Sequence, residues 1–413
     1  MEIADDPCQP LRARRWVHPL VVVALMGFAS GLPLYLTGST LRAWLTQSGL
    51  NLKTIGLFGL ITQPYALKFI WAPAMDRFTP FLGRRRGWML LTQGLLVLAL
   101  ALMAMGDPKV SVSRFVVLGF LVAFASASQD IVIDAWRAEA FPERELGMAN
   151  AVHVSAYRVA MLVSGGGAMI LAGRAGWRIS YLVMAGMMAL GALGTLLAWS
   201  TDLVARAPRT LRAAVVDPFR QFLSRPYVAE VLLFCLLYKI GDQLADAMTT
   251  SFLLRGMGFT LIQIGATTKT VGMTCIILGG LLGGLLMRRL SLKRALVLFG
   301  LCQGCSILAF WALSQLGPRL PVLVTALALE NLSYGMGGTA FATLLMCLCD
   351  KRFTATQYAL LSSITALARG YLTAPSGWVV NRIGWGGYFL LCAAAAVPGL
   401  LLLLRYDRWQ VEQ

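Results

Sequence analysis

The stretch DRFTPFLGRRR, residues 76–86, joins two apolar runs through a short loop that carries four arginines and one aspartate. A second short basic connection, GLLMRRLSLKR at residues 284–294, lies about half the chain further on and again separates two apolar runs. Two tight basic loops at corresponding places indicate that the chain consists of two related halves. Short loops rich in Lys and Arg are also typical of the cytoplasmic face of a membrane protein.

The composition around these loops is that of a polytopic membrane protein. Of the 413 residues, 58% are hydrophobic and only 13% are charged, whereas a soluble domain has roughly 25% charged residues. The net charge of +17 comes mostly from short loops between apolar runs. We therefore attribute this charge to membrane orientation and expect no nucleic-acid partner.

Twelve apolar runs are long enough to cross a bilayer. They cover residues 19–45, 53–76, 87–106, 114–138, 145–172, 177–199, 226–254, 261–287, 292–315, 319–348, 353–380 and 384–405. We predict an all-α membrane protein with six transmembrane helices in each half: residues 1–199, a polar cytoplasmic linker at 200–225, and residues 226–413. With a cytoplasmic N-terminus, 22 of the 36 Lys and Arg residues fall in cytoplasmic segments, which predicts that both termini are cytoplasmic.

Five cationic side chains lie deep inside these apolar runs, away from their ends, and a charge costs roughly 2.5–3.5 kcal/mol at the bilayer centre. They are Lys68, Arg158, Lys239, Lys269 and Arg369. We expect such charges to face a polar cavity inside the helix bundle. Lys68 and Lys269, and likewise Arg158 and Arg369, are separated by about half the chain. The sequence therefore predicts paired cations around a central site for an anionic solute.

The run at 114–138 carries two carboxylates one helical turn apart. Ser126, Asp130 and Asp134 recur every four residues, so they share one helix face. Mutual repulsion and removal from water both favour the protonated form of at least one carboxyl. We predict that Asp130 and Asp134 couple transport to protons. The alternative, which is compatible with that role, is that they form structural ion pairs with Lys68 or Arg158.

The second half contains further polar groups. Asp242 and Glu330 are additional candidates for proton coupling. Lys239 lies three residues before Asp242, so the two charges can neutralise each other, which weakens Lys239 as a substrate ligand. The carboxamide and aromatic groups of the kind that contact sugars are Gln129, Tyr157 and Asn331.

The first basic loop resembles the cytoplasmic loop signature of the major facilitator superfamily, in which an aspartate at a helix end precedes a run of arginines. Residues 80–82 are inserted before its Gly-Arg-Arg, and the second loop, 284–294, lacks the aspartate. A carboxylate paired with arginines of the next helix can latch one conformation. Alternatively, the loop charges set only the membrane orientation. The candidate latch residues are Asp76, Arg77, Arg84 and Arg85.

Longer motifs resemble the AmpG-type muropeptide permeases of this superfamily. They are FASGLP at 28–33, GRRRGW at 83–88, SASQDIVIDAW at 126–136, YKIGD at 238–242 and FTATQYALLS at 353–362. The resemblance covers nearly the whole chain and implies a monomeric facilitator of the bacterial inner membrane, without a cofactor. Such a protein imports anhydro-muropeptides with protons for cell-wall recycling and, in some bacteria, feeds β-lactamase induction. The resemblance also implies that Gly31, Ala127 and Gln129 are functionally sensitive.

Two other interpretations use the same residues. A proton-coupled facilitator of another anion, an acyl-CoA or a drug predicts a site that is less suited to sugars. A membrane-embedded protease would use paired aspartates as acid and base. However, the residues before Asp242 do not form the expected G-x-G-D pattern, and the chain has no H-E-x-x-H zinc motif. We therefore expect neither an enzymatic activity nor a metal site.

Overall fold

The computed structural model describes residues 17–202 and 210–409, and within them the side chains of all but a few positions, Arg369 among the exceptions. Every regular element in these ranges is helical. The elements of the first half are α1 (Pro19–Thr37), α2 (Ser39–Gln47), α3 (Leu52–Leu57), η2 (Phe58–Thr62), α4 (Pro64–Leu67), η3 (Lys68–Ile70), α5 (Ala72–Arg77), α6 (Arg84–Ala104), α7 (Val112–Ala140), α8 (Glu143–Leu162), η4 (Val163–Gly167), α9 (Ala168–Met187) and α10 (Ala189–Leu197).

The remaining elements follow in the same order along the chain. They are α11 (Leu211–Leu223), α12 (Val228–Leu237), α13 (Ile240–Ser251), η5 (Phe252–Gly256), α14 (Leu261–Thr267), η6 (Thr268–Gly272), α15 (Met273–Leu286), α16 (Leu292–Leu316), α17 (Leu320–Cys347), α18 (Thr354–Thr373), α19 (Ser376–Leu402) and η7 (Leu403–Arg408). Within the described ranges, seven helical segments are long and apolar enough to cross a membrane. The predicted all-α membrane class is therefore confirmed.

The predicted run 53–76 is not one continuous helix. It is divided into short pieces from α3 to α5, and Pro64 and Pro73 each lie in the first turn of a new piece. A proline lacks the N–H group that would continue the preceding helix, which explains both breaks. Lys68 therefore lies in the 3-10 turn η3. The run 226–254 is divided in a similar way, because α12 ends at Leu237 and α13 begins at Ile240.

Two glycine turns repeat between the halves. Gly176 inside α9 has φ 86°, and Gly384 inside α19 has φ 71°, a conformation that glycine adopts without steric penalty. About one helical turn later, a tyrosine hydroxyl donates to a backbone carbonyl of the first transmembrane segment of the same half. Tyr181 donates to Leu36 at 2.9 Å, and Tyr388 donates to Leu244 at 2.7 Å. This repeated contact supports the duplication that the basic loops indicated.

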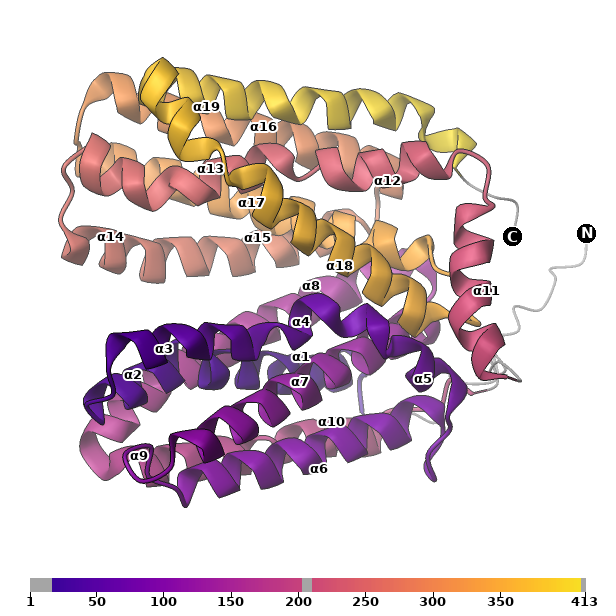
Figure 1. The fold of residues 1–413 in the computed structure, drawn as a ribbon. Coiled ribbons are helices and arrows are strands. Elements are labelled where there is room, and N and C mark those ends of the chain that lie inside the picture. The colour runs from indigo at the N-terminus through magenta and orange to yellow at the C-terminus, as the bar shows by residue number, and fades with distance from the viewer. Residues whose placement is uncertain (1–16, 203–209, 410–413) are drawn as a thin grey trace, which may run out of the picture.

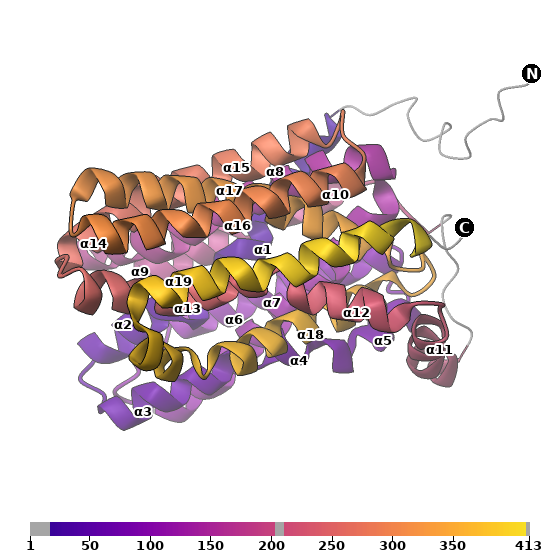
Figure 2. The same ribbon diagram turned by 90° about the horizontal axis from the view of Figure 1, so that it is seen from above.

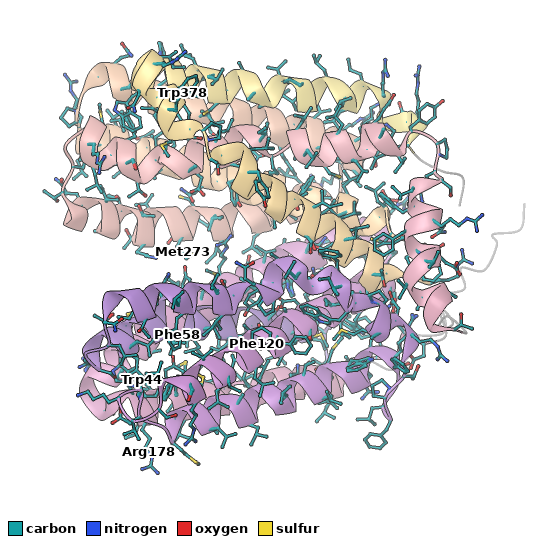
Figure 3. The ribbon with its side chains drawn as sticks, viewed as in Figure 1. Trp44, Phe58, Phe120, Arg178, Met273 and Trp378 are labelled. Atoms are coloured by element: carbon teal, nitrogen blue, oxygen red, sulfur yellow. The ribbon has the colours of Figure 1, made fainter. Side chains whose placement is uncertain are left out.

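The helices form two bundles that lie side by side, with α1 to α10 in one and α12 to α19 in the other (Figure 1). Helix α11 lies across one end of both bundles, nearly at right angles to the long helices (Figures 1 and 2). We call this the linker end. Trp44, in α2, lies near the opposite end of the first bundle, and Arg178 lies at its edge (Figure 3).

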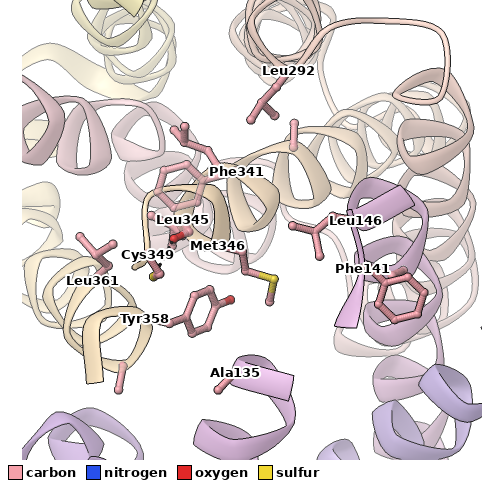
Figure 4. Close-up of a cluster of buried hydrophobic side chains, with 14 of the residues drawn as sticks. Ala135, Phe141, Leu146, Leu292, Phe341, Leu345, Met346, Cys349, Tyr358 and Leu361 are labelled. Carbon is pink, nitrogen blue, oxygen red and sulfur yellow. Dashed lines mark hydrogen bonds between the residues drawn. The ribbon is translucent and has the colours of Figure 1, made fainter. Parts of the chain in front are cut away.

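The hydrophobic cores show where the two bundles meet. The members of one buried cluster all come from the first bundle, between Ala29 and Met188, and the members of another all come from the second bundle, between Ala245 and Cys392. A third cluster takes residues from both bundles and includes Phe222 of α11. In this shared core, Ala135 and Leu146 of the first bundle face Met346 and Tyr358 of the second (Figure 4). The bundles thus share a core at the linker end and keep separate cores elsewhere.

Candidate functional site

The polar group of the first half is built around Asp130 and Asp134 on α7. Ser30 of α1 donates a hydrogen bond to Asp130 Oδ1. Asp134 Oδ1 accepts a 2.7 Å hydrogen bond from Arg137 Nη2, and Asp134 Oδ2 lies 3.9 Å from Lys68 Nζ. The ion pair between Asp134 and Lys68 that the sequence allowed is therefore present. Both side chains are mostly buried: 13% of the Asp134 side chain and 12% of the Lys68 side chain are exposed.

Arg137 connects this group to the next helix. Its Nε donates a 2.6 Å hydrogen bond to Oδ1 of Asn150 on α8. The sequence gives one signal for Arg137, its position three residues after Asp134. Ser30 and Asn150 come from other helices, so no spacing along α7 predicts them.

Arg158 on α8 has no carboxylate partner within the described part of the chain. Its Nη1 donates to Met161 Sδ at 3.9 Å, and its Nε is buried without a protein partner. A buried N–H group without a partner is unfavourable, so the half-buried Arg158 is a candidate to bind an anion. Tyr157, the preceding residue, interacts electrostatically with both Arg158 and Asp130.

Gln129 lies on a different face of α7 from Asp130. It is fully buried and shares its face with Val132 and Trp136, three and seven residues later. Neither its amide oxygen nor its amide nitrogen has a hydrogen-bond partner among the described residues. The structure therefore does not bring Gln129 onto the face that carries the carboxylates, and its amide needs partners such as water.

The second half holds a matching group around Asp242 on α13. Lys239 Nζ lies 3.4 Å from Asp242 Oδ2, and both side chains are almost fully buried. Gln303 of α16 donates to the same carboxylate, and the Lys239 ammonium lies 4.6 Å from the ring centre of Tyr334. The mutual neutralisation of Lys239 and Asp242 that the sequence predicted is confirmed.

The remaining candidates of the second half have different surroundings. On α17, Asn331 Nδ2 donates a 3.0 Å hydrogen bond to Glu330 Oε2. Lys269 in η6 is exposed, whereas Lys68 is largely buried and paired, so these two lysines do not form equivalent cationic positions. The lysine of the second half that resembles Lys68 in its pairing is Lys239. The side chain of Arg369 lies outside the described residues.

A third polar group lies at the linker end. Arg85 Nη2 lies 2.8 Å from Asp76 Oδ1 and 2.5 Å from Glu139 Oε1, and all three side chains are fully or almost fully buried. The other oxygen of Asp76 accepts hydrogen bonds of 2.8 Å and 2.6 Å from the backbone N–H and hydroxyl of Thr356. Thr356 lies in the first turn of α18, so Asp76 of one bundle caps a helix of the other.

Arg84 joins this group, the predicted latch, through a 3.2 Å ion pair with Glu139 and through a 3.5 Å hydrogen bond to the backbone oxygen of Arg352. Arg77 does not join it and lies over the ring of Phe78, the next residue. The sequence prediction missed Glu139, although a carboxylate at the end of the run 114–138 is a natural partner for loop arginines. The second basic loop makes the exposed ion pair between Lys293 and Asp407 instead.

Gly31 and Ala127 are both buried. A Cβ atom built on Gly31 overlaps the backbone oxygen of Tyr157, so α1 and α8 approach each other closely at this level. Glycine is required there because any side chain separates the two helices. Ala127 is fully buried on α7, where a larger side chain would have to displace its neighbours.

Known proteins resemble this chain over most of its length. The sequence model of the Major Facilitator Superfamily matches residues 23–373. The anhydromuropeptide permease of Escherichia coli K12 is 47% identical over 385 residues, which cover 93% of this chain and 78% of that protein. A putative AmpG transporter of Rickettsia conorii is 33% identical over 398 residues, which cover 94% and 96% of the two chains.

Solved structures agree on the fold. The proton:xylose symporter XylE, bound to 6-bromo-6-deoxy-D-glucose, matches with a TM-score of 0.69 at 13% identity and covers 94% of this chain and 95% of its own. A bacterial homologue of the iron transporter ferroportin in an outward-facing state matches with a TM-score of 0.70 at 15% identity and covers 94% and 98%. At such identities these matches show the fold alone. The chain belongs to the major facilitator superfamily and, within it, to the family of the anhydromuropeptide permease.

Proposed function

We propose that this protein imports 1,6-anhydro-muropeptides (N-acetylglucosamine linked to anhydro-N-acetylmuramyl peptide) into the bacterial cytoplasm by proton symport. The observation that carries this proposal is the 47% identity with the Escherichia coli anhydromuropeptide permease over 93% of the chain. The imported sugars and peptides would return to peptidoglycan synthesis and could feed the induction of β-lactamase. The protein acts as a monomer in the lipid bilayer of the inner membrane.

The linker end is the cytoplasmic end in this proposal. The predicted topology puts both termini and the linker 200–225 on the cytoplasmic side, and the shared core and the latch lie at the end that α11 crosses. The cytoplasmic end is therefore closed and the protein faces outward. The halves 1–199 and 226–413 would rock about the central site to open it inward.

The substrate carboxylates bind the central cations. Arg158 is the primary contact because it has no carboxylate partner in the described residues, and a guanidinium holds a carboxylate through two parallel hydrogen bonds. Lys68, Lys239, Lys269 and Arg369 supply further positive charge. Tyr157 and Asn331 contact the sugar hydroxyl and acetamide groups. Gln129 is fully buried on another face of α7, and from there it helps to hold in place the face that carries Asp130 and Asp134.

Protons enter through the carboxylates of the two polar groups. Asp134 is the first candidate because its charge holds both Lys68 and Arg137, and Asp130, Asp242 and Glu330 are the others. One proton that crosses 100 mV releases roughly 2.3 kcal/mol. An anionic muropeptide moves against the inside-negative potential, so concentrative import needs more than one proton for each anion.

Competition in reconstituted vesicles tests the substrate. Vesicles loaded with unlabelled anhydro-disaccharide tripeptide should take up the labelled compound by exchange. Excess free anhydro-disaccharide should block this exchange, whereas an acyl-CoA or an unrelated organic anion should not. If an acyl-CoA or a drug blocks the exchange and the anhydro-disaccharide does not, the protein belongs to another class of facilitator.

A further inference from the structure

A chain of hydrogen bonds connects Asp134 to the other half of the protein. Arg137 donates from Nη2 to Asp134 at 2.7 Å and from Nε to Asn150 Oδ1 at 2.6 Å. Asn150 Nδ2 then donates a 2.9 Å hydrogen bond to Thr343 Oγ1 on α17, and this hydroxyl donates to the backbone oxygen of Thr339 at 2.9 Å. We call these contacts the Asn150 relay.

The relay crosses between the bundles at a place that must open during transport. Asn150 lies about two turns from the start of α8, and Thr343 lies about one turn from the end of α17. Both are fully buried. Next to them, a Cβ atom on Gly284 of α15 would overlap Ala151 of α8, so the bundles are in close contact here. When the linker end opens, the bond between Asn150 and Thr343 has to break.

We propose that Asn150 is a coupling residue that passes the charge state of Asp134, through Arg137, to Thr343 in the other half. This inference rests on the proposed proton symport. While Asp134 is ionised, it shares the guanidinium of Arg137 with Asn150, and the amide of Asn150 is held with Nδ2 toward Thr343. When Asp134 takes up a proton, Arg137 loses its counter-charge. The Nη1 atom of Arg137 is already buried without a partner, so the guanidinium then has too few partners in this position and turns away. The Asn150 amide is then released, and the contact between the halves weakens.

Other titratable groups surround this pair and set the charge balance of the relay. Lys68 of η3 faces Asp134, and Asp130 lies one turn before it on α7. Helix α8 contributes Tyr157, which interacts with Asp134, and His153, which interacts with Arg137. Helix α18 contributes Tyr358, which interacts with both charges. Asp134 differs from these groups because Arg137 connects it directly to Asn150.

The test compares two activities of the full-length protein in vesicles: accumulation driven by an inward proton gradient, and substrate exchange without a gradient. Asn150→Leu and Thr343→Val remove the relay and nearly conserve side-chain volume. We expect the ratio of accumulation to exchange to fall by about tenfold in each, which corresponds to the loss of one hydrogen bond of ~1.4 kcal/mol. Thr343→Ser keeps the hydroxyl and should restore the ratio.

Thr195→Val is the matched control. Thr195 is equally buried and donates a hydrogen bond to Gln93 within the first half. Loss of this hydrogen bond should leave the ratio of accumulation to exchange unchanged. Accumulation and exchange that fall together in the Asn150 and Thr343 variants would show a structural role and overturn the relay.

The proposed function fails in a different way. If the unmodified protein exchanges substrate but never accumulates it with a gradient, proton symport is wrong, and the relay has no purpose. If the unmodified protein accumulates substrate, Asp134→Asn abolishes the accumulation and Asn150→Leu does not change it, proton coupling stands and the relay alone is overturned.

Discussion

At the residue scale, the close contact at Gly31 makes a direct steric prediction. Gly31→Ala would place a methyl group against the backbone oxygen of Tyr157, where neither helix can yield without moving. Overpacking of this kind destabilises a protein by roughly 1–3 kcal/mol, so we expect a lower melting temperature of the purified protein and reduced exchange. Gly94→Ala in α6 is the control, since a Cβ atom there has open space. Equal melting temperatures of the two variants would contradict the close helix contact.

Arg158, which has no carboxylate partner among the described residues, predicts a change in substrate affinity. Arg158→Gln removes charged hydrogen bonds worth roughly 1.5–3 kcal/mol, so the half-saturation concentration for exchange should rise by at least about tenfold. Arg178→Gln removes an exposed arginine at the edge of the first bundle (Figure 3) and should leave that concentration unchanged. An affinity that both variants lower equally would point to general charge attraction rather than a binding site.

At the element scale, Asp76 and its cap on α18 are predicted to hold the linker end closed. Asp76→Asn breaks a buried ion pair with Arg85, an effect of several kcal/mol, and should open that end more often. Cys349 lies in the shared core and reports on opening, whereas Cys392 lies in the separate core of the second bundle. Alkylation of Cys349 should become at least about tenfold faster, as measured by mass spectrometry, and that of Cys392 should not. A parallel rise at both cysteines would indicate general unfolding.

The contact of α11 with the second bundle predicts a pH-independent effect. Gln221 of α11 donates to Asp350, which also accepts hydrogen bonds from Arg352. Partial burial raises the pKa of Asp350, but these hydrogen bonds outweigh it, so the pKa lies below its ordinary value. A carboxylate with a lowered pKa keeps its contacts above its unfolded-state pKa of ~3.9 and loses them only as the pH falls through its lower folded-state value.

The linker contact is therefore constant over the physiological pH range. Asp350→Asn should change the transport rate by one factor at every pH between ~5 and ~8 and leave the midpoint of the pH profile in place. A shifted midpoint would mean that Asp350 takes part in the proton-dependent step.

Spacing along one helix was enough to predict part of the site. The shared face of Asp130 and Asp134 and the pairing of Lys239 with Asp242 depend on local geometry alone. The partners that come from neighbouring helices, such as Ser30 and Asn150, depend on how the helices of the first bundle pack against α7, which one sequence does not show. Pro64 and Pro73 predict the two helix breaks near them, but a count of apolar residues along the run 53–76 does not detect such breaks. Gln129 lies within the right motif but on a different helix face.

At the scale of the whole molecule, the two halves meet differently at their two ends. They share a hydrophobic core, the latch and the Asn150 relay at the linker end, and their other cores are separate. A rocking transporter needs this arrangement, because one closed end can be exchanged for the other without unfolding either half. The fold class followed from composition and apolar runs. The contact between the bundles at the linker end did not, since it depends on residues as distant along the chain as Asp76 and Thr356.

Proton-driven import can be measured as substrate uptake into vesicles. Labelled anhydro-disaccharide tripeptide is offered outside vesicles that contain the full-length protein, with and without an inward proton gradient. We predict accumulation above the external concentration with the gradient, and its loss both with a protonophore and in Asp134→Asn. Uptake that only equilibrates, to the same level with or without the gradient, would show that the protein does not couple import to protons.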